Sequence, residues 1–307
     1  MKKNFLFVAI IALFIGLAFH SCKKDDKNTP DDGKIDPSTI ANANLIAYWG
    51  FENSPKDEIG QRGVASASVS YPTGRRGMAF QGGTGSYISF DLPASDKLAT
   101  MKAFTIAMWI KAPTLADANG IPCFFQLSGK NWNGAFSIYQ DNLGDNTADS
   151  LRLRSYFGKQ GANWAGQWVD QTNPIMTADK WFHFVLNYDN TTSISTMYIN
   201  GDAYKVQTLS AYDTPVRYQD DPGGADNPNG AAKLGDLNLE LRSKAPTDAS
   251  NDDKGIIGYW AIKAFYGGTD DWQGFFSGMI DELRVYDKAL SDQEVKDLYD
   301  AEVTQVN

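Results

Sequence analysis

The segment from Phe276 to Tyr299 constrains the fold of this chain more than any other. Its first half alternates as an extended strand does, with one side formed by Met279, Asp281, Leu283 and Val285 and the other by Ile280, Glu282, Arg284 and Tyr286. On that pattern Asp281 is an acid among apolar neighbours on a central strand. A buried carboxylate needs a cation or several hydrogen-bond donors, so Asp281 is expected to be either a metal ligand or a hydrogen-bonded strut.

The second half of the segment predicts a short helix. Ser291 is a suitable N-cap, and Glu294 three residues later can reach back to it in a capping box. Leu290 and Val295 flank this cap and can form a hydrophobic staple. Asp292 adds negative charge to the first turn, where the helix dipole favours it. The chain is therefore expected to end in a strand, a turn and a helix.

The composition favours β structure and argues against a nucleic-acid partner. The 28 basic and 37 acidic side chains give a net charge of −9, whereas a phosphate backbone calls for a basic face. The 8 Trp, 14 Tyr and 17 Phe suit pleated sheets, in which aromatic side chains pack well. Strands are predicted at 45–53, 64–69, 77–90 (two strands around a Gly-rich turn), 104–111, 151–157, 181–188 and 195–200. With no internal repeat, these strands predict an all-β fold, a single antiparallel two-sheet jelly-roll sandwich with a short C-terminal helix.

Five motifs in order resemble laminin-G-like domains of the concanavalin A-like lectin/glucanase superfamily. They are Tyr-Trp-x-Phe-Glu at 48–52, the Gly-rich strand pair at 77–90, Trp-x-His-x-x-x-x-Tyr at 181–188, Met-Tyr-Ile-Asn-Gly at 197–201, and the closing strand and helix. Together they cover roughly residues 45–302. The resemblance implies a jelly roll that binds a glycan or glycoconjugate.

The same resemblance implies a structural calcium ion, because many such domains hold one near their first and last strands. Carried over to this sequence, the side-chain ligands are Glu52 and Asp281, with backbone carbonyls near Gly82 and Tyr87 completing the oxygen shell that calcium prefers. The alternative is that Asp281 accepts hydrogen bonds from loop amides while Glu52 is solvated.

The sequence offers little for catalysis, so a binding protein is expected more than an enzyme. Retaining glucanases of this fold resemble one another in a Glu-x-Asp-x-x-Glu strand, which this chain lacks. Asp281 and Glu282 are adjacent and are expected to point to opposite faces. His183 alternates with apolar residues as a packed histidine does, and Cys123 is expected to be a buried small hydrophobe. A glycoside hydrolase or lyase with acids on separate loops stays open.

Four tryptophans with small and polar neighbours are predicted to lie at loop tips and to bind the glycan: Trp132, Trp164, Trp168 and Trp272. The face of a Trp ring stacks on the C–H face of a sugar, while nearby polar side chains take the hydroxyls. The alternative is that each ring covers the edge of the sandwich. Residues 141–150 and 211–254 are predicted to be long acidic loops, which leaves a protein-binding adhesin as a further possibility.

Residues 1–21 are predicted to be a lipoprotein signal peptide. The apolar run from Phe5 to Phe19 is too short to span a bilayer, and Cys22 follows it, so Cys22 is expected to carry the lipid. The cluster Lys23–Asp26 resembles the surface-export signal of Bacteroidetes lipoproteins. Residues 22–44 are then a disordered tether and 45–307 the domain, anchored in the outer membrane at the cell surface beside a polysaccharide-uptake system. The alternatives are ordinary secretion with cleavage near Ser21, and a charged tether that is merely solvated.

Overall fold

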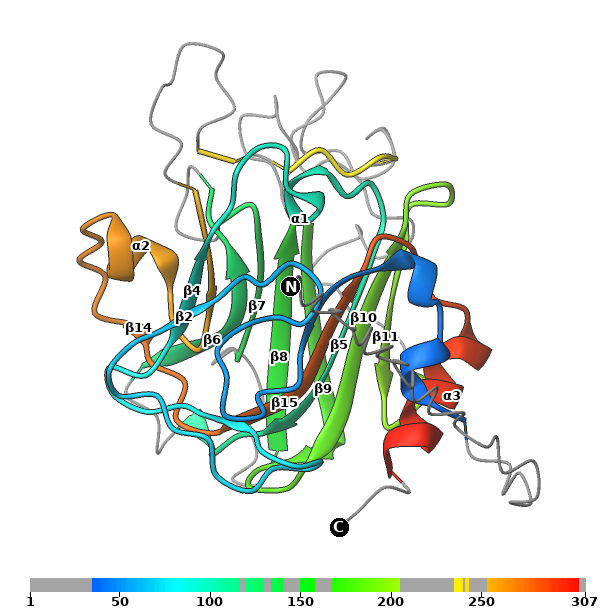
Figure 1. Ribbon diagram of the computed structural model, residues 1–307, viewed down its shortest axis with the longest axis horizontal. Coiled ribbons are helices and arrows are strands. Elements are labelled where there is room, and N and C mark those ends of the chain that lie inside the picture. The colour runs from blue at the N-terminus through cyan, green and yellow to red at the C-terminus, as the bar shows by residue number, and fades with distance from the viewer. Residues whose placement is uncertain are drawn as a thin grey trace, which may run out of the picture. The chain divides into compact units, whose positions relative to one another are not determined.

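Two sheets packed face to face make up the folded part of the chain (Figure 1). The computed structural model describes residues 35–115, 120–129, 134–140, 150–157, 167–204, 235–239, 241–242 and 253–303, with the backbone alone at 150 and 167–175. All strand pairs are antiparallel except β14 with β6. The predicted all-β jelly-roll sandwich is confirmed.

The first sheet has the strand order β1-β15-β5-β10-β11-β12, with β3 paired to β15. Its strands are β1 (Leu45–Trp49), β3 (Phe80–Gln81), β5 (Phe104–Lys111), β10 (Phe182–Asp189), β11 (Ile194–Ile199), β12 (Asp202–Tyr204) and β15 (Met279–Tyr286). The closing strand β15 therefore lies between β1, where the sandwich begins, and β5. This places it centrally, as predicted.

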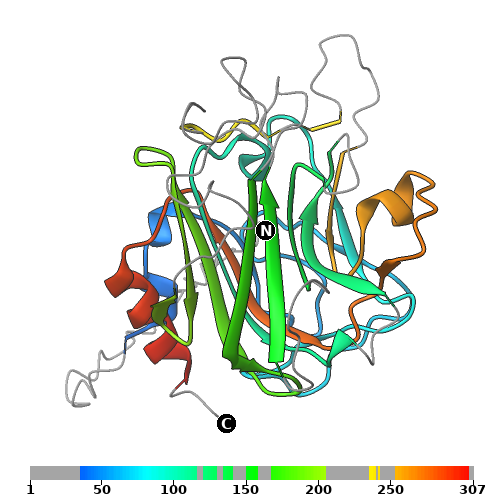
Figure 2. The same ribbon diagram turned by 180° about the vertical axis from the view of Figure 1, so that it is seen from behind.

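The second sheet has the order β2-β4-β13-β6-β7-β8-β9, with β14 paired to β6. Its strands are β2 (Val64–Ala65), β4 (Ile88–Asp91), β6 (Ile121–Leu127), β7 (Phe136–Gln140), β8 (Ser150–Phe157), β9 (Gln167–Thr177), β13 (Lys254–Ile257) and β14 (Gln273–Gly274). The helical pieces are short: η1 (Pro37–Thr39), η2 (Asn42–Asn44), α1 (Lys97–Thr100), α2 (Ala261–Phe265) and α3 (Asp292–Val303). In Figure 2, α2 (orange) and α3 (red) lie on opposite sides of the sandwich.

The core lies between the two sheets and is rich in aromatic rings. Alternate residues of β5 point into it, beginning with Phe104 and Ile106. Phe104 meets Phe136 of the second sheet edge-on, with ring centroids 5.0 Å apart. Each such large apolar side chain contributes roughly 2 kcal/mol by leaving water. The alternation predicted for 104–111 is thus the pattern of a strand with one face in the core.

A β-bulge in β15 changes which residues face the core. Asp281 pairs with Trp109 and Arg284 with Ala107, so two residues of β15 oppose one of β5. Glu282 absorbs the extra residue with a φ of 51°. As a result Ile280, Leu283 and Val285 lie in the core, whereas Asp281 lies on the outer face with Trp109. The expectation that Asp281 shares a face with Leu283 is therefore wrong, as is the expectation that Asp281 and Glu282 point to opposite faces.

Helix α3 covers the outer face of the first sheet, and its predicted start is confirmed. The amide of Glu294 donates to Ser291 Oγ (3.2 Å), and the amide of Ser291 donates to Glu294 Oε2 (2.8 Å). Leu290 and Val295 pack in one apolar cluster. The capping box and the apolar flanks together fix where the helix begins.

The compact unit begins at Ile35, so residues 35–44 of the predicted tether belong to the fold. Asp36 caps η1, and Ile40 packs against Val295 and Leu298 of α3. Asn44 Nδ2 donates to Asp287 Oδ1 at 2.8 Å. The predicted signal peptide and Cys22 lie outside the described residues. Within the described part of the chain, no helix is long and apolar enough to cross a membrane.

Candidate functional site

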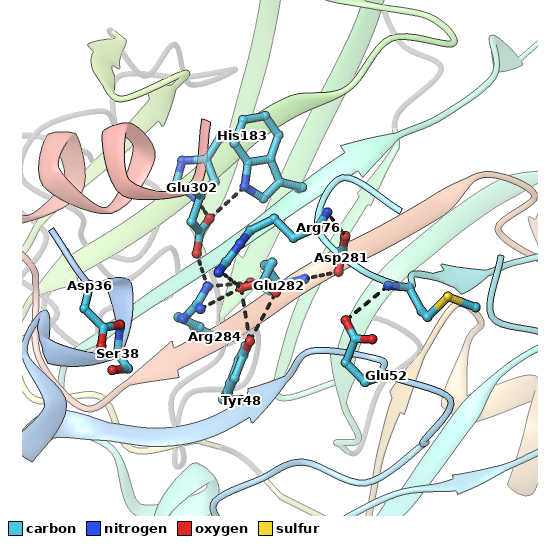
Figure 3. A network of polar contacts seen from close by, with 12 residues as sticks. Asp36, Ser38, Tyr48, Glu52, Arg76, His183, Asp281, Glu282, Arg284 and Glu302 are labelled. Atoms are coloured by element: carbon cyan, nitrogen blue, oxygen red, sulfur yellow. Dashed lines mark hydrogen bonds and ion pairs between the residues drawn. The ribbon is translucent and has the colours of Figure 1, made fainter. Parts of the chain in front are cut away.

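A group of buried charges lies between α3 and the outer face of the first sheet (Figure 3). We call Tyr48, Arg76, Glu282, Arg284 and Glu302 the polar clasp. Glu282 Oε2 accepts hydrogen bonds from Arg284 Nη2 (2.6 Å) and Arg76 Nη1 (2.8 Å). Tyr48 donates to the same carboxylate at 3.1 Å, and Arg284 also pairs with Glu302. Burial opposes the charge of Arg284, but Glu302 and Glu282 outweigh it and raise its pKa. The clasp therefore ties β1 and β15 to the end of α3.

His183 lies beside the clasp and is packed, as predicted. Its ring is fully buried, 5.2 Å from the ring of Trp109, and its Nε2 is 3.7 Å from Glu302 Oε2. Burial, together with the charge of Arg284, lowers its pKa to about 3, so His183 is neutral. Burial raises the pKa of Glu302 to about 7 despite Arg284 and the hydrogen bond from Trp109 Nε1 (2.7 Å). A neutral histidine without access to solvent is not placed to act as a base on a substrate.

Asp281 of β15 and Glu52, which follows β1, both accept hydrogen bonds from the loop 74–78 (Figure 3). Asp281 Oδ2 accepts from the Arg76 amide at 2.9 Å, and Glu52 Oε1 accepts from the Met78 amide at 3.1 Å. Gly77 lies so close that a Cβ there would be 1.9 Å from Glu52 Oε1. The two predicted calcium ligands are thus brought to one loop.

Burial makes Asp281 an unusual carboxylate. It raises the pKa of Asp281 to about 8, because the amides of Arg76 and Glu282 offset only part of the cost of desolvation. Among the described residues no ammonium or guanidinium pairs with Asp281, since the guanidinium of Arg76 binds Glu282 instead. Asp281 is thus a buried acid without a cation within the described residues, and Glu52 supplies a second carboxylate that contacts the same loop. Two such carboxylates suit the all-oxygen shell of calcium.

The two predicted carbonyl ligands have other partners. The Gly82 carbonyl accepts from Gln81 Nε2 at 2.8 Å, and the Tyr87 carbonyl accepts from the Ser66 amide at 2.9 Å. In the described part of the chain, no three His, Cys, Asp or Glu residues group as a metal site. Further oxygens would have to come from backbone carbonyls, and calcium stays a prediction.

The four predicted tryptophans are described to different extents. Trp132 and Trp164 lie outside the described residues. Trp168 belongs to β9 and pairs with Tyr156 of β8, and only its backbone is described. Trp272 is half-buried and meets the buried ring of Trp260 edge-on at 5.4 Å. Trp272 therefore covers part of the outer face of the second sheet and keeps part of its ring exposed.

A set of partly exposed rings near α2 escaped sequence reasoning. We call Tyr87, Tyr259, Phe265 and Phe275 the aromatic platform. Tyr259 stacks on Phe275 with centroids 3.7 Å apart and an angle of 11°. Tyr87 also stacks on Tyr259, with centroids 6.1 Å apart, and Phe265, 36% exposed, meets Tyr87 edge-on at 6.2 Å. Burial and the nearby Tyr87 raise the pKa of Tyr259, so its hydroxyl keeps its proton.

Comparison with known proteins matches this architecture. A family model described as Concanavalin A-like lectin/glucanases superfamily, of laminin-G type, matches residues 82–238. No curated protein is significantly similar in sequence. Domain 4 of an extracellular arabinanase from Geobacillus stearothermophilus, solved with arabinotriose, has a TM-score of 0.50 at 20% identity and covers 83% of this chain and 98% of its own.

Two further structures are binding domains of botulinum neurotoxin DC. The one solved with rat synaptotagmin II has a TM-score of 0.52 at 13% identity, and the match covers 86% of this chain and 52% of that chain. The one solved with SialylT has a TM-score of 0.53 at 13% identity, with 85% and 52% covered. The chain thus spans about half the length of these toxin domains. At such identities the likeness establishes the fold.

Proposed function

Because the chain belongs to the laminin-G branch of the concanavalin A-like lectin/glucanase superfamily, we propose that it binds carbohydrate without cleaving it. The observation that carries this proposal is the aromatic platform, in which four rings are already packed against one another and partly exposed. The arabinanase domain solved with arabinotriose is a case of this fold with a sugar ligand.

The platform has the features that sugar binding requires. Aromatic faces accept the C–H face of a pyranose or furanose ring, and rings fixed by their neighbours lose little conformational freedom on binding. The hydroxyls of Tyr87 and Tyr259 can donate to and accept from sugar hydroxyls. Trp272 lies on the same side of the sandwich, where it packs on Trp260, the residue that follows Tyr259. It offers a second stacking position.

A glycan array followed by titration of the hits tests the platform. We expect Tyr259→Ala and Phe265→Ala each to weaken binding about threefold to tenfold, the value of one stacking contact. Ile59→Ala is the matched control, because Ile59 is 50% exposed and apolar but lies outside the platform. Variants of Trp132, Trp164, Trp168 and Trp272 belong in the same series, since each is a predicted stacking residue.

The outcomes separate the possible functions. If both platform variants bind the glycan as tightly as the parent, the platform is not the binding site. If only a Trp variant loses glycan affinity, that Trp marks the binding site instead. If no glycan binds, carbohydrate recognition is wrong and a protein ligand becomes the better explanation. Release of reducing sugar from a bound polysaccharide would show a hydrolase or lyase instead.

We propose that calcium bound by Asp281 and Glu52 stabilises the loop 74–78. Adding calcium to chelated protein should raise the melting temperature of the parent and leave Asp281→Asn unchanged. In the chelated parent the folded state keeps the Asp281 proton up to about pH 8, whereas the unfolded state loses it near 3.8. Stability therefore falls as pH rises from 4 to 8.

Asp281→Asn imitates the protonated acid and should remove this fall. Asp202→Asn serves as the matched control because Asp202 is exposed on β12. The calcium proposal fails if calcium does not raise the melting temperature of the parent, whatever the pH dependence of its stability.

We further propose that the chain is a surface lipoprotein of the outer membrane, anchored through Cys22. The support is the apolar run of the leader, the position of Cys22 behind Ser21, and the Lys-Asp cluster that follows. Growth with a labelled fatty acid should label the parent and leave Cys22→Ser unlabelled. Protease added to intact cells should digest the protein if it is surface-exposed; protection would place it on the inner side of the membrane.

A further inference from the structure

A groove of about 660 Å³ lies on the outer face of the first sheet and is lined by none of the platform residues. The hairpin of β10 and β11 forms one wall, and the turn that leads from β15 into α3 forms the other. We call it the acidic groove, since its lining includes Asp189, Asp287 and Glu294 and a single basic residue, Lys288. Its volume falls within the range of small-ligand sites.

Two of the three carboxylates carry charge that no basic side chain offsets among the described residues. Lys288 Nζ pairs with Glu294 at 2.8 Å, so these two neutralise each other. Asp287 Oδ1 accepts only from the neutral amide of Asn44 (2.8 Å). Asp189 accepts from Thr191 Oγ1 (2.7 Å) and other neutral donors of its turn.

Both carboxylates are held in place by hydrogen bonds. Burial opposes the charge of Asp189, but hydrogen bonds from Thr191 and Thr192 outweigh it and lower its pKa. Asp287 is fixed by a second contact, because its amide donates to the Asn44 carbonyl at 3.0 Å. The groove is therefore lined by two carboxylates whose positions are fixed by hydrogen bonds.

An apolar wall accompanies these charges. Ile194 lines the groove and is 38% exposed, one of few large apolar side chains in the described residues that reach so far into solvent. Asn187 is buried at the base, where its Nδ2 donates to the Leu290 carbonyl (3.0 Å) and its Oδ1 accepts from the Thr196 amide (3.2 Å). No aromatic ring of the described residues lines the groove, so the stacking that would favour a neutral sugar is missing.

We propose that the acidic groove binds a protonated primary amine on an aliphatic or sugar stem. The ammonium group supplies the positive charge that Asp189 and Asp287 lack, and the stem packs on Ile194. A lysine side chain and an amino sugar both present this chemistry. The groove would thus give the protein a second recognition site, on the opposite sheet from the aromatic platform.

Matched pairs of small probes test the proposal on the purified whole chain by isothermal or NMR titration. The first pair is Nα-acetyl-lysine N-methylamide and its neutral counterpart, the same compound acetylated at Nε. The second pair is glucosamine and its neutral counterpart, glucose. We expect saturable binding of at least one amine and none of its neutral counterpart. Binding should weaken several-fold as salt is raised, because the attraction is between charges at a solvent-filled groove.

Asp189→Asn and Asp287→Asn should each weaken amine binding about tenfold, the value of one charge-assisted contact. Asp202→Asn should leave it unchanged. Two carboxylate variants are needed because Asp189 also orders its own turn, whereas Asp287→Asn keeps the contact with Asn44. Binding of glucosamine alone would assign the amine to a sugar, and binding of the lysine probe alone would assign it to a peptide. Failure of both amines to bind, or equal binding by both carboxylate variants and the parent, overturns the proposal.

Discussion

At the scale of single residues, burial shifts the pKa values of His183 and Glu302, whose side chains lie 3.7 Å apart, in opposite directions. In the folded state Glu302, with a pKa of about 7, holds the proton, while His183, with a pKa of about 3, does not. In the unfolded state the ordinary values of 6.5 and 4.5 put the proton on the histidine. Between pH 4.5 and 6.5 both states therefore bind one proton, and the pair gives stability no pH dependence in that range.

When either residue is replaced, the stability of the protein should depend on pH through the residue that is left. The two variants should show pH dependences of opposite sign. In Glu302→Gln only His183 titrates, and because the unfolded state alone takes up its proton, stability should fall as pH drops below 6.5. In His183→Phe only Glu302 titrates, and because the folded state alone keeps its proton, stability should fall as pH rises from 4.5 to 7. Each dependence is at most about 1.4 kcal/mol per pH unit.

Denaturant unfolding from pH 4 to 8 measures these profiles. Asp297→Asn is the matched control, since Asp297 belongs to the same helix and accepts a hydrogen bond from Gln293 at the surface (2.7 Å). Profiles of both variants that run parallel to that of the parent would show that burial does not shift the two pKa values as described. A loss of stability that is the same at every pH would show only that the packing around Trp109 has been damaged.

At the scale of elements, the sequence predicts best where pattern and burial agree. Strand β5 has the bounds predicted from its alternation, and the start of α3 follows from Ser291, Glu294 and the apolar residues beside them. Strand β6 was not predicted, because its sequence, Ile-Pro-Cys-Phe-Phe-Gln-Leu, does not alternate and is almost wholly buried. Such a run does not reveal its period.

The faces of β15 were mispredicted for a different reason. The bulge at Glu282 depends on a positive φ that an alternating pattern does not encode. The bulge sets the surroundings of both acids, because it places Asp281 on the outer face beside the loop 74–78 and directs Glu282 into the polar clasp. The acid was identified from the sequence, but its surroundings depend on the backbone.

The rings of the aromatic platform can be found in the sequence, but their proximity in the fold cannot. Three of its rings belong to aromatic doublets, and in two of these, 259–260 and 275–276, Trp260 and Phe276 are buried while Tyr259 and Phe275 are partly exposed. An alternating pattern indicates that one ring of each of these two doublets is buried. It does not indicate that the partly exposed rings, Tyr259 and Phe275, stack on each other. Only the pairing of distant strands brings Tyr87 beside Tyr259.

At the scale of the whole molecule, the two ends of the domain stabilise each other. Residues 35–44 lie along α3, and Figure 1 shows these first turns (blue) beside the last helix (red). Ile40 is 8% exposed in the cluster that Leu290, Val295 and Leu298 complete. The segment therefore contributes buried apolar surface to the fold and is more than a linker.

A chain that begins at Leu45 should be less stable than one that begins at Ile35 by about 3 kcal/mol. Burial of Ile40 accounts for roughly 2 kcal/mol and the hydrogen bonds of Asn44 with Asp287 for about 1 kcal/mol. Ile40→Ala in the longer chain should reproduce the apolar part, at about 2 kcal/mol. Ile35→Ala, at an exposed position of the same segment, should cost less than about 0.5 kcal/mol.

Denaturant midpoints of these chains distinguish a docked segment from a passive one. If residues 35–44 were only a tether, both starting points would give the same stability and Ile40→Ala would have no effect. If they are docked as described, their loss should also free the N-terminal half of α3, because Val295 and Leu298 lose a packing partner there. Amide exchange in α3 should then accelerate more than in β10, whose Phe184 and Leu186 lie in the core between the sheets.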